Sequence, residues 1–160
     1  FARYLDTFTK FFNEFGAQLE LKNFPIHAEF KLQGQDFIPI EFNPMRYGGF
    51  GLADLGFHSY GFHPIAAYFA GNTLDWSDIW QTRQEYSYAF ILAYNPKQPS
   101  PQHKPNHERF RKHLQQHVEI MDYIKLDHSS NPVFAIAYIK SSDPSRMMSL
   151  LETEFADFFD

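Results

Sequence analysis

The chain has 160 residues, the length of one ordinary domain, and its 19 phenylalanines can supply a sizeable apolar core. A formal net charge of −5, without any cluster of Lys and Arg, argues against nucleic acid as the main partner. The sequence has no cysteine, hence no disulfide framework or thiol chemistry, and shows neither a membrane-spanning apolar run nor a signal-peptide pattern, so we expect a cytoplasmic protein without a membrane partner.

The first apolar pattern predicts a helix over residues 1–15. Six large side chains recur at helical spacing: Tyr4, Leu5, Phe8, Phe11, Phe12 and Phe15. Gly16 stands where a glycine commonly ends a helix, and we expect the helix to stop there. Because the sequence opens at Phe1 already inside this pattern, with no methionine and no cap, we expect it to be the C-terminal part of a longer protein.

Residues 27–43 indicate two alternating strands joined by a polar turn around Gly34. A two-residue loop would pair Glu29 with Ile40 and direct the carboxylates of Glu29 and Glu41 to opposite faces. A three-residue loop at 34–36 instead gives one continuous apolar face, with the pairs Ala28–Phe42, Phe30–Ile40 and Leu32–Ile38. We therefore predict the three-residue loop, which sets Glu29 directly opposite Glu41 with Cβ atoms about 5 Å apart.

This register places three potential oxygen ligands, Glu29, Glu41 and Asn43, on one face of the hairpin. Like charges directly opposite each other destabilise a strand pair, and a divalent cation between them would remove that penalty. Mg²⁺ prefers carboxylate and carbonyl oxygens together with substrate phosphates, so the donor set indicates a metal site. The alternative is a solvated acidic face. We expect His27 opposite Asn43 in a structural role, and Pro39, which has no N–H, indicates a sheet edge or a bulge.

A glycine-rich loop is predicted over residues 44–51, directly after the second strand. Gly48, Gly49 and Gly51 allow the backbone to approach a ligand closely, and their amides can receive a phosphate or a carboxylate. The alternative is a plain structural turn.

The hairpin and the loop resemble the metal-binding end of the ATP-grasp ligases over residues 24–51. The resemblance rests on Glu29-Phe30, Ile40-Glu41-Phe42-Asn43-Pro44, Arg46 and Gly48-Gly49. It implies that Glu29, Glu41 and Asn43 hold Mg²⁺, or Mn²⁺, against the phosphates of ATP. The family usually has its arginine two residues after the asparagine, where this chain has Met45, and Arg46 follows one residue later. The resemblance implies a catalytic role for Arg46, with Gly48 and Gly49 in ATP or substrate binding.

Short helices are predicted over residues 52–60 and 64–70, and a short helical turn or a loop over 75–80. Asp54 and His58 are one helical turn apart on the first of them, and His63 lies close by in the sequence. These three residues could orient a substrate, and the alternative is a role in capping and packing.

The second half of the chain predicts the order β-α-β-β-α, with strands over 86–94, 120–126 and 133–141. Asn106 is expected to cap the middle helix, and Asp143 with Pro144 to open the last one. His113 and His117 have a spacing that can chelate zinc, but no third ligand is evident, and we expect a solvated face. This half is predicted to be a supporting layer or a dimerisation surface in which strand 136–139 pairs with a partner.

The expected fold class is therefore α+β: the C-terminal part of an ATP-grasp fold over residues 1–80, followed by an α+β subdomain over 81–160. The expected function is that of a fragment of an ATP-dependent carboxylate–amine ligase that works through an acylphosphate and is inactive alone. Its partners would be ATP, a small carboxylate and a nucleophile, with a homo-oligomer as a further possibility. One alternative is a non-catalytic interaction or oligomerisation domain. Another, a hydrolase using a metal held by Glu29 and Glu41, lacks a His-rich ligand set and a general base.

Overall fold

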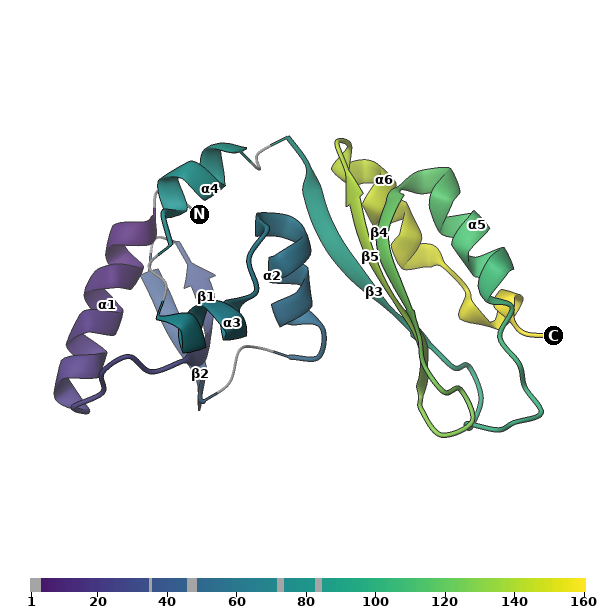
Figure 1. Cartoon of the computed structure of the whole chain (residues 1–160), viewed down its shortest axis with the longest axis horizontal. Helices are drawn as coiled ribbons and strands as arrows, with labels where there is room; N and C mark the ends of the chain where they lie inside the picture. The colour runs from purple at the N-terminus through teal and green to yellow at the C-terminus, as the bar shows by residue number, and fades with distance from the viewer. Residues whose placement is uncertain (1–3, 35, 46–48, 72–73, 83–84) are drawn as a thin grey trace. The chain divides into compact units, whose positions relative to one another are not determined.

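The computed structural model describes residues 4–34, 36–45, 49–71, 74–82 and 85–160 (Figure 1). The chain divides into two compact units, Phe1–Gly48 and Gly49–Asp160. Both combine helices with small antiparallel sheets, which confirms the α+β class. No helix in the described parts of the chain is long and apolar enough to cross a membrane.

In the first unit, helix α1 (Leu5–Gln18) packs against the hairpin of β1 (Ile26–Gln33) and β2 (Asp36–Pro44). The contact is made by aromatic rings: Phe8 lies 4.5 Å from Phe37, Phe11 5.4 Å from Phe30, and Phe15 4.8 Å from Phe42, between ring centroids. Such ring pairs add about 0.5–1.5 kcal/mol each beyond the burial of area. The predicted aromatic stripe is therefore the packing face of the helix.

The predicted end of α1 at Gly16 is wrong, because the helix continues to Gln18. The Leu19 amide still donates to the Phe15 carbonyl oxygen at 3.2 Å, and the left-handed backbone conformation occurs later, at Glu20. A glycine inside a helix costs only about 1 kcal/mol relative to alanine, which the packing of neighbouring Phe15 on Phe42 offsets.

The predicted pairs Glu29–Glu41 and Ala28–Phe42 are confirmed, but the loop length and the strand register that produce them differ from the prediction. Gln33 pairs with Asp36, so the loop is one residue shorter than predicted, and the register shifts at a bulge where Ile40 is the extra residue. The bulge is one of the two outcomes that Pro39 indicated.

Beyond the bulge, the predicted pairs Phe30–Ile40 and Leu32–Ile38 are wrong, because Phe30 pairs with Pro39 and Leu32 with Phe37. Phe37 therefore takes the place on the helix-facing side that the sequence pattern assigned to the isoleucines, and Ile38 and Ile40 are exposed. A one-residue shift exchanges the two faces of a strand, which accounts for the exchange.

The second unit begins with α2 (Leu52–Tyr60), α3 (Pro64–Ala70) and α4 (Trp76–Thr82). The first two confirm the predicted helices, and α4 shows that the helical alternative holds for the third segment. Pro64 takes the first position of α3, where its missing N–H has no cost. Gly61 and Gly71 end α2 and α3 in the left-handed conformation, with φ of 77° and 64°.

The rest of this unit follows the predicted order β-α-β-β-α. Strand β3 (Ser87–Tyr94), helix α5 (His107–His117), strands β4 (Glu119–Lys125) and β5 (Val133–Ser141) and helix α6 (Pro144–Met148) are followed by the 3-10 turns η2 (Ser149–Glu152) and η3 (Phe155–Phe158). Asn106 and Asp143 cap their helices, by accepting from the amides of Arg109 and Ser145. The antiparallel sheet has the order β3-β5-β4. The predicted pairing of strand 136–139 with a partner is therefore wrong, since β5 is the central strand and is paired on both sides.

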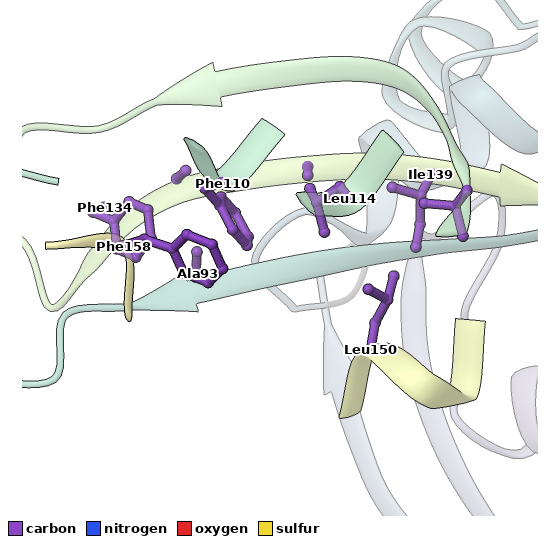
Figure 2. Packing of buried hydrophobic residues seen from close by; sticks show 10 residues of the cluster. Ala93, Phe110, Leu114, Phe134, Ile139, Leu150 and Phe158 are labelled. Atoms are coloured by element: carbon purple, nitrogen blue, oxygen red, sulfur yellow. The ribbon is translucent and has the colours of Figure 1, made fainter. Parts of the chain in front are cut away.

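The core of the second unit lies on both faces of β5. On one face, Phe110 and Leu114 of α5 pack with Phe134 and Ile139, and Leu150 and Phe158 complete the layer (Figure 2). Helix α5 and α6 lie on this same side of the sheet (Figure 1). On the other face, Ile136 and Tyr138 of β5 pack with Leu55 of α2 and Phe90 of β3. Ala135, Ala137 and Ile139 on the first face thus alternate along β5 with Ile136 and Tyr138 on the second, so that α5 packs on one side of the strand and α2 on the other.

Candidate functional site

Four polar side chains share the face of the hairpin that is opposite to α1. Glu29 lies directly across from Glu41, and His27 across from Asn43 as predicted. His27 Nε2 is 3.0 Å from Glu29 Oε1, and the Asn43 side-chain amide donates to Glu41 Oε1. Half of the Glu29 side chain, 51%, is exposed. Each carboxylate therefore has one polar neighbour on its own strand, and both remain accessible from solvent.

This donor set fits a hard divalent cation, although it does not complete a site alone. The described residues contain no group of three or more His, Cys, Asp and Glu side chains that could hold a metal ion. Two carboxylates on facing strands and the carbonyl oxygen of Asn43 would leave further positions to phosphate oxygens or water. Mg²⁺ is commonly bound in this way, through one or two carboxylates and the phosphates of a substrate.

Of the residues predicted in the glycine-rich loop, Arg46 and Gly48 lie outside the described residues. Gly49 is described, and its carbonyl oxygen accepts from the Leu52 amide at 3.1 Å, immediately before α2 begins. Gly51 has a φ of 86° and precedes the first residue of α2. A Cβ atom on Gly51 would lie 3.2 Å from the Tyr138 hydroxyl, so both its conformation and its surroundings require glycine.

Tyr138 on β5 joins this loop to the sheet of the second unit. Its side chain is buried, and its hydroxyl lies 3.4 Å from the Gly51 carbonyl oxygen and 3.4 Å from Asp54 Oδ2. Burial raises the pKa of the Tyr138 phenol to about 12, and the charge of Asp54 acts in the same direction. The sequence pattern gave Tyr138 no role beyond an apolar strand, because nothing in the order of residues shows that β5 faces Gly51.

The predicted trio of Asp54, His58 and His63 is only partly brought together. His63 Nε2 lies 3.6 Å from Asp54 Oδ1, whereas His58 Nε2 lies 3.8 Å from Asp122 Oδ2 on β4. The His58 ring packs on the Tyr138 ring at 4.6 Å between centroids. These contacts agree with the packing alternative, since each histidine is held against a neighbouring element.

His113 and His117 each lie beside a hydroxyl group of the segment that follows α6. His113 Nε2 is 3.2 Å from Thr153 Oγ1, and His117 Nδ1 is 3.2 Å from Ser149 Oγ. Burial lowers the pKa of His113. The expectation of a solvated face is therefore wrong for these two, because the 3-10 turns after α6 fold back on α5 and supply hydroxyl partners.

Comparison with known proteins places the hairpin in a family. The ATP-grasp domain model matches residues 1–54, about a third of the chain, and this stretch holds Glu29, Glu41, Asn43 and Gly49. No curated protein and no solved structure matches the chain significantly. The matched segment contains the facing glutamates, so residues 1–54 of this chain are similar to an ATP-grasp domain.

Proposed function

We propose that this chain supplies the metal- and phosphate-binding part of an ATP-dependent ligase that joins a small carboxylate to an amine or a related nucleophile. The observation that carries the proposal is the direct pairing of Glu29 with Glu41, inside the segment that matches the ATP-grasp family. Asn43 lies on the same face as both carboxylates. Like charges directly opposite each other destabilise the strand pair, and the cation that the family binds with its nucleotide would remove this penalty.

In this proposal, Glu29, Glu41 and Asn43 hold Mg²⁺, with Mn²⁺ as an alternative. The metal would supply charge neutralisation for the phosphates of ATP. The task of the protein is to position two carboxylates that repel each other at a fixed spacing, which the backbone pairing of β1 with β2 does. The bond to Glu41 is donated by the amide nitrogen of Asn43, so the carbonyl oxygen of the same side chain is the atom that would face the cation.

The reaction would proceed in two displacements. An oxygen of the substrate carboxylate attacks the γ-phosphorus of ATP, the bond to the bridging oxygen breaks, and ADP leaves. The nucleophile then attacks the acyl carbon of the acylphosphate, and inorganic phosphate leaves with the bonding electrons. We assign Arg46 and the amides of Gly48 and Gly49 to the transferred phosphate or the substrate acid, because an arginine and free amides stabilise developing negative charge.

The residues of this chain alone are proposed not to catalyse. The family also uses a glycine-rich lid with lysines and a segment that holds adenine, and neither pattern is recognisable in this sequence. We expect titration calorimetry with MgATP to show no tight binding to the chain. A Kd near 1 μM, about −8 kcal/mol, would contradict this statement.

A metal-binding measurement tests the ligands without depending on turnover. We expect electron paramagnetic resonance to show Mn²⁺ bound by the wild-type chain, with affinity reduced at least tenfold by Glu41→Gln or Glu29→Gln. Glu14→Gln is the matched control, because it removes the same charge from an exposed position of α1 in the same unit. Equal Mn²⁺ affinity in all four proteins would rule out the hairpin as a metal site.

The activity is tested in a full-length protein, expected to be cytoplasmic, that contains this chain. Carboxylate-dependent release of ADP, with a hydroxamate formed when hydroxylamine is added, would report an acylphosphate. Glu41→Gln should abolish both signals with little change in Tm. If neither signal depends on Glu41 or on Mg²⁺, a non-catalytic interaction domain becomes the better assignment.

A further inference from the structure

A cavity of about 520 Å³ lies in the second unit between α2, α4 and β3. Small-molecule sites typically have volumes of about 300–1,000 Å³. Aromatic rings make up most of its wall, with leucines from α2 beside them: Leu52, Leu55, Tyr60, Trp80, Tyr86 and Tyr88. All of these residues belong to the unit that starts at Gly49.

The aromatic rings that line the cavity contact one another or further aromatic rings. Tyr60 packs against Phe62 at 6.3 Å and against Trp76 at 6.1 Å, and the Tyr86 and Tyr88 rings lie 6.4 Å apart. Contacts of this kind fix ring orientations before a ligand arrives, which lowers the entropic cost of binding. Trp80 and Tyr86 nevertheless keep 36% and 41% of their surface exposed, so that their rings can still be covered by a ligand.

The charge around the cavity indicates which chemical group fits it. None of the described residues that line it is charged, and its polar groups are the hydroxyls of Ser59 and the tyrosines and the indole N–H of Trp80. Lys140 Nζ lies 4.9 Å from the centre of the Tyr86 ring and is paired with Glu119 at 3.1 Å. A cationic ligand would compete with Lys140 for this ring, and a buried carboxylate would find no opposite charge. A neutral planar ring would not compete with Lys140 as a cation does, and it would not need an opposite charge.

The cavity adjoins the glycine-rich loop. Leu52, which lines it, is the first residue of α2, and its Cδ1 atom lies 3.9 Å from the position that a Cβ atom on Gly49 would take. We infer that the cavity binds the aromatic ring of the carboxylic acid substrate, with the carboxylate directed to the Gly49 side. This inference rests on the proposed function for the identity of the ligand as a substrate, and on the cavity alone for the preference for an aromatic ring.

The first test uses two probes of the same charge and chain length, 3-phenylpropionate and 3-cyclohexylpropionate. We expect saturation-transfer NMR to show 3-phenylpropionate bound to the chain at least fivefold more tightly than its saturated analogue. Trp80→Leu and Tyr88→Leu should each weaken binding at least fivefold. Tyr94→Leu is the matched control, because Tyr94 is an exposed tyrosine at the other end of β3 and does not line the cavity.

Equal binding of the two probes, or no binding of either, would overturn the inference, and so would equal losses in Tyr88→Leu and Tyr94→Leu. Thermal unfolding establishes that each variant is folded, and if Trp80→Leu is not, Tyr88→Leu and its control decide alone. A different measurement tests the proposed function itself. In the full-length protein, ADP release that is unaffected by Glu41→Gln would remove the ligase assignment, whereas a Glu41-dependent release that aryl acids do not stimulate would remove only the substrate class.

Discussion

The two units of this chain are held together in different ways. In the second unit, Phe110, Leu114, Phe134 and Ala137 have no exposed surface, and the central strand is buried along almost its whole length. In the first unit, no residue of α1 is fully buried, and the helix contacts the hairpin through partly buried phenylalanine rings. The proposed metal ligands are in the first unit, whereas the second unit holds the aromatic cavity. The proposed metal ligands therefore lie in the less tightly packed of the two units.

The largest expected effect is a test of that difference in packing. Phe110→Ala should destabilise the second unit by about 3–5 kcal/mol, because the ring is completely buried. Phe42→Ala should cost the first unit only about 1–2 kcal/mol, because its side chain is only partly buried. Urea unfolding, with hydrogen exchange to assign each loss to a unit, measures both. Equal losses would show that the first unit is packed more tightly than its exposure indicates.

A smaller effect concerns the glycine that joins the loop to α2. Gly51→Ala should cost about 1–3 kcal/mol, because an alanine there combines a positive φ with a contact of 3.2 Å to Tyr138. Gly71→Ala is the control, since its φ is also positive but no atom lies within 4 Å of the added Cβ. Gly71→Ala should lose only the stability that a positive φ costs an alanine, about 1 kcal/mol. The comparison fails if the two variants unfold at the same urea concentration.

A still smaller effect on stability is expected at the facing glutamates, where the substitution should stabilise the protein. Without divalent cations, Glu41→Gln should stabilise the first unit by about 0.2–1 kcal/mol, because it removes a like-charge pair across the strands. Added Mg²⁺ should stabilise the wild-type protein and leave the variant unchanged. Thermal unfolding with and without Mg²⁺ measures both shifts, and Glu14→Gln should show neither. A destabilised, Mg²⁺-independent variant would indicate that Glu41 is structural.

The last effect is expected only at alkaline pH, in the second unit. The folded-state pKa of Tyr138 is raised to about 12, above its ordinary value of about 10. Its contribution to stability is therefore complete below about pH 10 and is lost as the pH rises towards 12. Tyr138→Phe should flatten the dependence of Tm on pH in that window, whereas Tyr94→Phe, at an exposed position, should not. A wild-type slope retained in Tyr138→Phe would assign the alkaline loss to other groups.

Local patterns predicted much of this fold. The helix over 52–60, the strand over 133–141 and the caps at Asn106 and Asp143 depend on residues next to one another in sequence, and all are confirmed. The end of α1 was predicted wrongly, because the contact of Phe15 with Phe42 is made with a distant strand. The neighbours of β5 are also set by distant segments, which is why a central strand was expected to be an edge.

The candidate site shows the same division. Glu29 and Glu41 were predicted to face each other, and they do, because the apolar pairing of Ala28 with Phe42 fixes this part of the hairpin. Contacts across the chain were missed: the aromatic cavity joins α2, α4 and β3, and the Tyr138 hydroxyl approaches Gly51 from a strand 87 residues further on. No spacing in the sequence carries that information.

The bulge at Ile40 separates the geometry of the acidic pair from that of the hairpin tip. A short loop with one extra strand residue and a longer loop with none give the same pairing of Glu29 with Glu41. A chain that lost Ile40 and gained one residue at the tip would therefore keep both carboxylates in place. Hairpins with tips of different lengths can thus carry the same facing carboxylates, and a comparison of such sequences should be anchored on the base of the hairpin.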